Sequence, residues 1–63
     1  MVKGVMVSRL SNNIMHVTEG ESYPIIAIES LTFYGTRYYY FDDRGELAWA
    51  YEGTPYFDVH LHK

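Results

Sequence analysis

The chemistry that this chain offers is mainly aromatic, and its rings crowd into the segment from residue 37 to 51. Tyrosine or phenylalanine occupies every position of 38–41, and Trp49 and Tyr51 follow after a short polar stretch. Rings that line a groove can hold proline-rich peptides or stack on nucleic-acid bases. The plainer alternative is a core made of the same rings, but tyrosines on both faces of one strand cannot all be buried. We therefore predict a partner-binding surface that includes Tyr34, Tyr39, Trp49, Tyr51 and Tyr56.

A second candidate is the acidic cluster between the two aromatic runs, where Asp42 and Asp43 precede Arg44, and Glu46 follows Gly45. Carboxylates at this point could pair with arginines of a partner or mimic phosphates. The alternative is a solvated turn, which is the usual setting of such charges, and Arg44 would dilute any phosphate mimicry. We include Asp42 and Asp43 in the predicted partner-binding surface.

Metal and catalytic sites find less support in the residue pattern. Asp58, His60 and His62 alternate along one segment, and two histidines at i and i+2 can chelate a divalent metal. The same pattern describes the polar face of an exposed strand, so we predict neither a metal site nor a cofactor. Histidine could act as a base for a serine or for Thr54, but no sequence context marks a nucleophile, and so small a chain offers little concavity. We expect a protein that is not an enzyme.

Composition limits the chain to one small domain spanning residues 1–63. The chain has no cysteine and 17% aromatic residues, so large rings rather than disulfides must supply its stability. Five lysines and arginines against eight acids give a net charge of −3, and the cations are scattered, which disfavours nonspecific nucleic-acid binding. No secretory or membrane-spanning apolar run occurs, so we expect a cytoplasmic protein with no membrane partner.

Period-2 alternation and turn residues predict an all-β fold of about five antiparallel strands and no helix. The expected strands lie at about residues 2–10, 22–29, 37–41, 46–51 and 56–62. Gly45 supplies the left-handed residue of the hairpin between the third and fourth strands, and residues 30–36 form a loop. Because Pro24 cannot donate to a sheet ladder, the second strand should begin at a sheet edge.

Alternation also divides each strand into two faces. In the third strand the even-numbered tyrosines share one face and Tyr39 lies on the other, and the pattern leaves open which face is buried. In the fourth strand one face carries Leu47, Trp49 and Tyr51, and the other face carries Glu46 and two alanines. We therefore expect three larger side chains to face the core or a cleft: Leu47, Trp49 and Tyr51.

The strand order, with a polar-tipped hairpin and a brief turn before the last strand, is that of an SH3-like barrel. The segments Val17–Tyr23 and Tyr38–Glu46 resemble the pattern L-T-x-G-K-x-Y … D-D-x-G-E of short SH3-like proteins encoded by bacteriophages. The resemblance covers residues 14–61, although Glu21 stands where the pattern has lysine and residues 50–55 lack its proline-led segment. It implies a small, partly open SH3-like barrel and a binding domain that acts on a host protein.

Together these features favour a small non-enzymatic protein-interaction module that binds through its aromatic hairpin. If a phage encodes it, it would modulate or inhibit a host protein in the host cytoplasm. One alternative is single-stranded nucleic-acid binding through the same rings, with Lys3, Arg9 and Arg37 on phosphates and an affinity that falls steeply with salt. Another is a self-associating structural component, because exposed strand edges can pair two copies into a homodimer.

Overall fold

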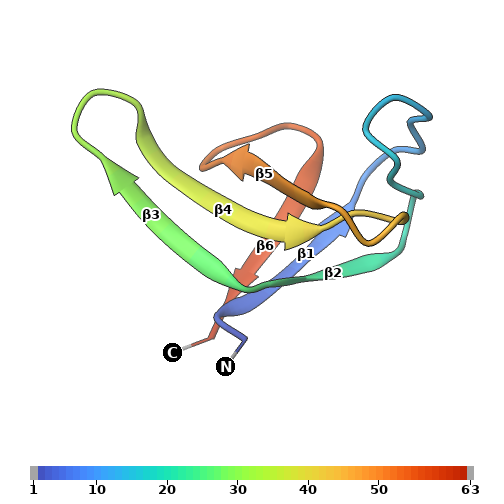
Figure 1. Cartoon of the computed structure of the whole chain (residues 1–63), viewed down its shortest axis with the longest axis horizontal. Helices are drawn as coiled ribbons and strands as arrows, with labels where there is room; N and C mark the ends of the chain where they lie inside the picture. Colours follow the sequence, from blue (N-terminus) through green and yellow to red (C-terminus); the bar gives the residue numbers. More distant parts are fainter. Residues whose placement is uncertain (1, 63) are drawn as a thin grey trace.

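Six antiparallel strands form two three-stranded sheets, with the order β2-β1-β6 in one and β3-β4-β5 in the other (Figure 1). This computed structural model describes residues 2–62, and Met1 and Lys63, the ends of the predicted domain, lie outside the described residues. The strands are β1 (Gly4–Ser8), β2 (Ser22–Ile25), β3 (Ala27–Leu31), β4 (Gly35–Phe41), β5 (Leu47–Tyr51) and β6 (Phe57–Leu61). The all-β, antiparallel prediction is confirmed, and the sheets do not close into a barrel.

The sixth strand arises because the predicted second strand is divided at Ile26. Its first half, β2, pairs with β1, whereas its second half, β3, pairs with β4 in the other sheet. Ile26 joins the two halves, and its N–H donates to the carbonyl oxygen of Tyr39 at 2.9 Å. β2 is an edge strand and its Pro24 is exposed, as the missing amide donor of proline requires. One bent segment therefore links the two sheets.

The core lies between the sheets and depends on three aromatic rings. The rings of Tyr23, Tyr40 and Phe57 meet edge to face, with centroids 5.4 to 6.2 Å apart. Each large ring removes about 150–250 Å² from water, so these three rings stabilise a domain that has no disulfide. The other buried apolar residues are Met6, Val17, Ile25, Tyr38 and Ala50.

The larger side chains of the fourth strand do not face the core, which was one of their two predicted placements. The register of β4 and β5 sets Tyr38 opposite Ala50 and Tyr40 opposite Ala48, and residues that are directly opposite share a face. Because the two tyrosines fill the inner face, only small side chains fit beside them. The larger side chains of β5 are accordingly exposed on the outer face, and these are Leu47, Trp49 and Tyr51.

The predicted loop at residues 30–36 is shorter than expected. β3 extends to Leu31 and β4 begins at Gly35, so a tight turn of residues 32–34 joins them. Gly35 has a φ of 82°, which is the left-handed conformation that closes such turns. The turn projects Phe33, which is 90% exposed, and Tyr34 into solvent. No helix in residues 2–62 is long and apolar enough to cross a membrane.

Candidate functional site

The outer face of the β3-β4-β5 sheet carries a cluster of aromatic side chains around one arginine. Cross-strand register places Glu29 beside Arg37 and Arg37 beside Tyr51, while Tyr39 lies beside Trp49 in the next row. The Cβ atoms of directly opposite residues in an antiparallel pair lie about 4.5–5.5 Å apart, which is close enough for these side chains to interact. We call this set of residues, Glu29, Arg37, Tyr39, Trp49 and Tyr51, the aromatic face.

Arg37 holds the rings of the aromatic face together. Its guanidinium carbon lies 4.4 Å from the ring centroid of Trp49, 5.6 Å from that of Tyr51 and 6.0 Å from that of Tyr39. Trp49 and Tyr51 also contact each other edge to face, with centroids 4.9 Å apart. A cation over an aromatic ring contributes about 0.5–2 kcal/mol, depending on how far it is desolvated. The rings are therefore ordered although Trp49 remains 46% exposed.

Hydrogen bonds fix the polar side of the same cluster. The Tyr39 hydroxyl donates to Glu29 Oε1 at 2.8 Å and accepts from Arg37 Nη1 at 3.2 Å. Arg37 Nη1 lies 3.9 Å from Glu29 Oε1, so the carboxylate compensates the guanidinium charge. The hydrogen bond with Tyr39 raises the pKa of Arg37 above its ordinary value. Arg37 is thus a fixed, charge-paired centre.

The two aspartates of the predicted surface make hydrogen bonds within the molecule. Asp42 Oδ1 accepts from the N–H groups of Arg44 and Glu46 at 2.9 and 3.1 Å, which closes the β4–β5 turn. Burial raises the pKa of Asp42, but these hydrogen bonds and the charge of Arg44 outweigh burial and lower it overall. Asp43 accepts from the hydroxyls of Tyr23 and Thr18 at 2.7 and 2.8 Å. Both carboxylates therefore stabilise the hairpin tip.

The structure brings together only part of the predicted surface. Three of its members, Tyr39, Trp49 and Tyr51, meet on the aromatic face, whereas Tyr34 lies in the turn between β3 and β4. Tyr56 lies in the segment between β5 and β6, beside a cavity. Sequence reasoning missed the central position of Arg37 and its partner Glu29. The signal that could have found it is the hairpin register, since Asp42 opposite Glu46 sets Arg37 opposite Tyr51.

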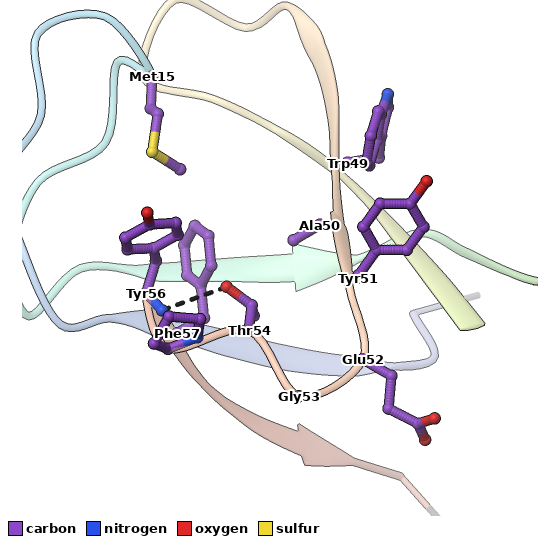
Figure 2. Close-up of a pocket in the computed structure, with 10 residues that line it drawn as sticks. Met15, Trp49, Ala50, Tyr51, Glu52, Gly53, Thr54, Tyr56 and Phe57 are labelled. Atoms are coloured by element: carbon purple, nitrogen blue, oxygen red, sulfur yellow. Dashed lines mark hydrogen bonds between the residues drawn. The ribbon is translucent and has the colours of Figure 1, made fainter. Parts of the chain in front are cut away.

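The cavity beside Tyr56 has a volume of about 420 Å³ and lies on the inner side of β5 (Figure 2). Ala50, Met15 and Phe57 line it with apolar side chains. Figure 2 shows the rings of Trp49 and Tyr51 on the other side of the strand, pointing away from these residues. Trp49 and Tyr51 also line the cavity, so β5 contributes its backbone to the cavity wall.

Arg9 and Asp58 form an ion pair outside the aromatic face. Arg9 Nε donates to Asp58 Oδ1 at 2.8 Å, and this hydrogen bond lowers the pKa of Asp58. Asp58 is thus engaged by Arg9, beside His60 and His62 on the same segment. Within residues 2–62 there is no group of three or more His, Cys, Asp or Glu side chains placed to hold a metal.

Comparison of the chain with known protein families, with curated proteins and with solved structures gave no match. The features that bear on function are then the aromatic face, the cavity and the backbone of β5 between them.

Proposed function

We propose that this chain is a small non-enzymatic protein-interaction module that binds a partner protein through its aromatic face. The observation that carries the proposal is the exposed cluster of Tyr39, Trp49 and Tyr51, which Arg37 holds in a fixed arrangement. A cluster needed only for folding would be covered by the core, yet these rings lie on the outside of the sheet. Exposed apolar patches of this kind mark interaction sites in small proteins.

The residue types of the aromatic face suit a protein partner. Tryptophan, tyrosine and arginine dominate the residues whose truncation costs protein complexes the most affinity. Rings that are already fixed lose little conformational entropy on binding, so more of the contact energy appears as affinity. Phe41 and Leu47 extend the exposed apolar surface along the same hairpin. A partner could therefore cover a continuous surface on β4 and β5.

The strand order also supports the proposal that the fold is an SH3-like, partly open barrel. β1 pairs with β6 and with the first half of the bent segment, and the second half starts the β3-β4-β5 sheet. The proposed role as a phage-encoded modulator or inhibitor of a host protein is consistent with this compact design, because one exposed face could block a surface of a larger enzyme.

The charges favour a protein over a nucleic acid as the partner. Three of the five cations, Arg9, Arg37 and Arg44, are paired with carboxylates, and the net charge is −3. Nucleic-acid affinity depends largely on cations that neutralise phosphates. A nucleic-acid binder would show affinity that falls steeply between low and high salt, whereas a contact dominated by rings would change little.

The test compares three immobilised proteins in a bacterial lysate: the unaltered chain, Trp49→Ala and Phe33→Ala. Phe33 is a matched control, because it is also an aromatic residue, is 90% exposed and lies outside the aromatic face. We expect one captured protein whose binding survives nuclease treatment of the lysate. This protein should bind the unaltered chain and Phe33→Ala with equal affinity, and should bind Trp49→Ala at least about 30-fold more weakly. Equal capture by all three proteins, or loss of capture after nuclease treatment, would contradict the proposal.

A further inference from the structure

β5 is one of the two edge strands of its sheet, and the hydrogen-bond pattern shows which of its backbone N–H and C=O groups are free. The N–H of Asp42 donates to the carbonyl oxygen of Glu46 at 2.9 Å, and the N–H of Glu52 donates to that of Thr36 at 2.8 Å. In an antiparallel pair, every second residue directs its N–H and C=O to the neighbouring strand. The even-numbered residues of β5 therefore point toward β4, and the odd-numbered residues point outward.

The outward groups belong to Leu47, Trp49 and Tyr51. Among the described residues the backbone N–H and C=O of Leu47 and Trp49 have no partner on this side. Further along, the carbonyl oxygen of Tyr51 accepts from the N–H of Thr54 at 3.1 Å, so the turn closes that end of the edge. A short strand edge with two donors and two acceptors is thus open between residues 47 and 49.

The open edge borders the 420 Å³ cavity. A strand added beside β5 would alternate its side chains between the two faces of the sheet. The residue opposite Ala50 would then enter the apolar cavity between Met15 and Phe57, while its neighbours would lie beside Trp49 and Tyr51 on the aromatic face (Figure 2). The edge, the cavity and the aromatic face therefore form one continuous surface for an extended chain.

The end of this surface at Glu52 carries, among the described residues, an unpaired negative charge. Glu52 lies at the end of the edge and lines the cavity, and it forms no ion pair with another residue of the described range 2–62. Arg44, the cation closest in sequence to β5, is already paired with Asp42 and Glu46. A basic side chain on an added strand would meet an uncompensated carboxylate at Glu52.

We propose that the partner supplies an extended segment that adds to the free edge of β5 as a fourth strand. The segment pairs its backbone with Leu47 and Trp49, places an apolar side chain in the cavity opposite Ala50, and places a basic side chain near Glu52. Such β-strand addition obtains affinity from main-chain hydrogen bonds and specificity from alternate side chains. This inference rests on the proposed protein-binding function and specifies how the partner is bound.

A second copy of β5 fits the same edge poorly. Antiparallel self-pairing that joins Leu47 to Trp49 of the other copy sets Glu46 opposite Ala50, which brings a carboxylate toward the apolar cavity. The register with Trp49 on the two-fold axis instead sets Glu46 opposite Glu52, and like charges directly opposite are destabilising. Both registers put an acidic residue where the cavity and Glu52 favour apolar and basic groups.

The experiment measures amide hydrogen exchange by NMR with three synthetic peptides. The first, the valine–arginine peptide, places valine opposite Ala50 and arginine opposite Glu52, and the second has glutamate in place of this arginine. The third is the first with N-methyl groups on the residues opposite Leu47 and Trp49, which then cannot donate hydrogen bonds to β5 in an antiparallel pair. In the free protein we expect fast exchange at Leu47 and Trp49 and slow exchange at Ala48 and Ala50. At ten times its Kd, the valine–arginine peptide should slow exchange at Leu47 and Trp49 about tenfold, and the other two peptides should not.

A variant pair tests the backbone contact from the protein side. Leu47→Pro removes the outward N–H but leaves the ladder to β4 intact, since proline is tolerated where the N–H faces away, and Leu47→Ala is the control that keeps this N–H. We expect Leu47→Pro to bind the valine–arginine peptide about fivefold more weakly than Leu47→Ala, the loss of about one hydrogen bond. If Leu47→Pro does not fold, the comparison with the N-methylated peptide decides.

Three results would overturn the inference: no protection of Leu47 and Trp49 with the valine–arginine peptide, equal binding of the N-methylated peptide, or protection without peptide that accompanies a dimer in sedimentation. The last would assign the edge to a second copy. These failures leave the proposed function standing if capture of a protein from lysate still depends on Trp49. If capture fails as well, the proposed function fails with the inference.

Discussion

The hydroxyl of Tyr23 ties three separate segments together, and Tyr23→Phe should be costly for that reason. The side chain of Tyr23 is 5% exposed, and its hydroxyl accepts from the N–H of Thr18 at 2.8 Å and donates to Asp43 Oδ1 at 2.7 Å. Three segments therefore meet at one oxygen atom: β2, the loop between β1 and β2 at Thr18, and the tip of the β4–β5 hairpin. Phenylalanine keeps the ring contacts with Tyr40 and Phe57 and removes only this connection.

The size of the effect follows from the two hydrogen bonds. A hydrogen bond between neutral groups contributes about 0.5–1.5 kcal/mol, and one to a charged group about 1.5–3 kcal/mol. Asp43 is exposed and retains the hydrogen bond from Thr18 Oγ1, so water can replace part of what is lost. We therefore expect Tyr23→Phe to lower the free energy of unfolding by about 2 kcal/mol. For a domain of this size that corresponds to a decrease in Tm of about 8–16 °C.

Thermal and urea unfolding followed by circular dichroism measure this difference. Tyr56→Phe is the matched control, because Tyr56 is half-exposed and no hydrogen bond of its hydroxyl occurs in the described range 2–62. The control should change stability by less than about 0.5 kcal/mol. If Tyr23→Phe is as stable as Tyr56→Phe, the hairpin tip is not held by this hydroxyl and the account of Asp43 as a structural residue is wrong.

Two further predictions concern the sheet and the pH range of stability. Gly4→Ala should lower the free energy of unfolding, measured in urea, by about 1–3 kcal/mol. The reason is that a Cβ at Gly4 would lie 2.5 Å from the carbonyl oxygen of His60. Ser22→Ala, at an exposed position on β2, is the control, and an equal loss of stability in the two variants would refute this contact. Burial raises the pKa of both Tyr23 and Tyr40, whereas tyrosines in the unfolded chain titrate near pH 10. The unfolded state therefore loses protons first, so the urea midpoint should be constant just below about pH 10 and fall above it. A midpoint that stays constant to higher pH would show that these hydroxyls are not buried.

Local sequence signals predicted the strands well where a single residue type decides the conformation. Gly45 has a φ of 76° and lies in the turn between β4 and β5, as the hairpin prediction required. Pro24 lies on an edge strand because it lacks the N–H of a ladder donor. In both cases the constraint acts within one residue, so no knowledge of the tertiary structure is needed.

The features that sequence reasoning missed depend on contacts between strands. Ile26 divides a continuous apolar run because its two halves pair with different strands, and no local signal marks that point. Trp49 is on the outer face because Tyr38 and Tyr40 fill the inner one, which is decided by the combined volume of paired residues. The role of Asp43 likewise depends on Tyr23, twenty residues away in sequence.

Trp49 is the only tryptophan in the chain, so it can report directly on whether the aromatic face binds a partner. Incorporation of 5-fluorotryptophan gives one ¹⁹F NMR signal, which an unlabelled partner does not contribute to. On addition of the captured partner, we predict that the chemical shift of this signal changes. We also predict that the shift difference between H₂O and D₂O disappears, because the half-exposed ring becomes buried in the complex. An unchanged signal in a sample whose sedimentation shows complete complex formation would contradict the proposal that the partner binds the aromatic face.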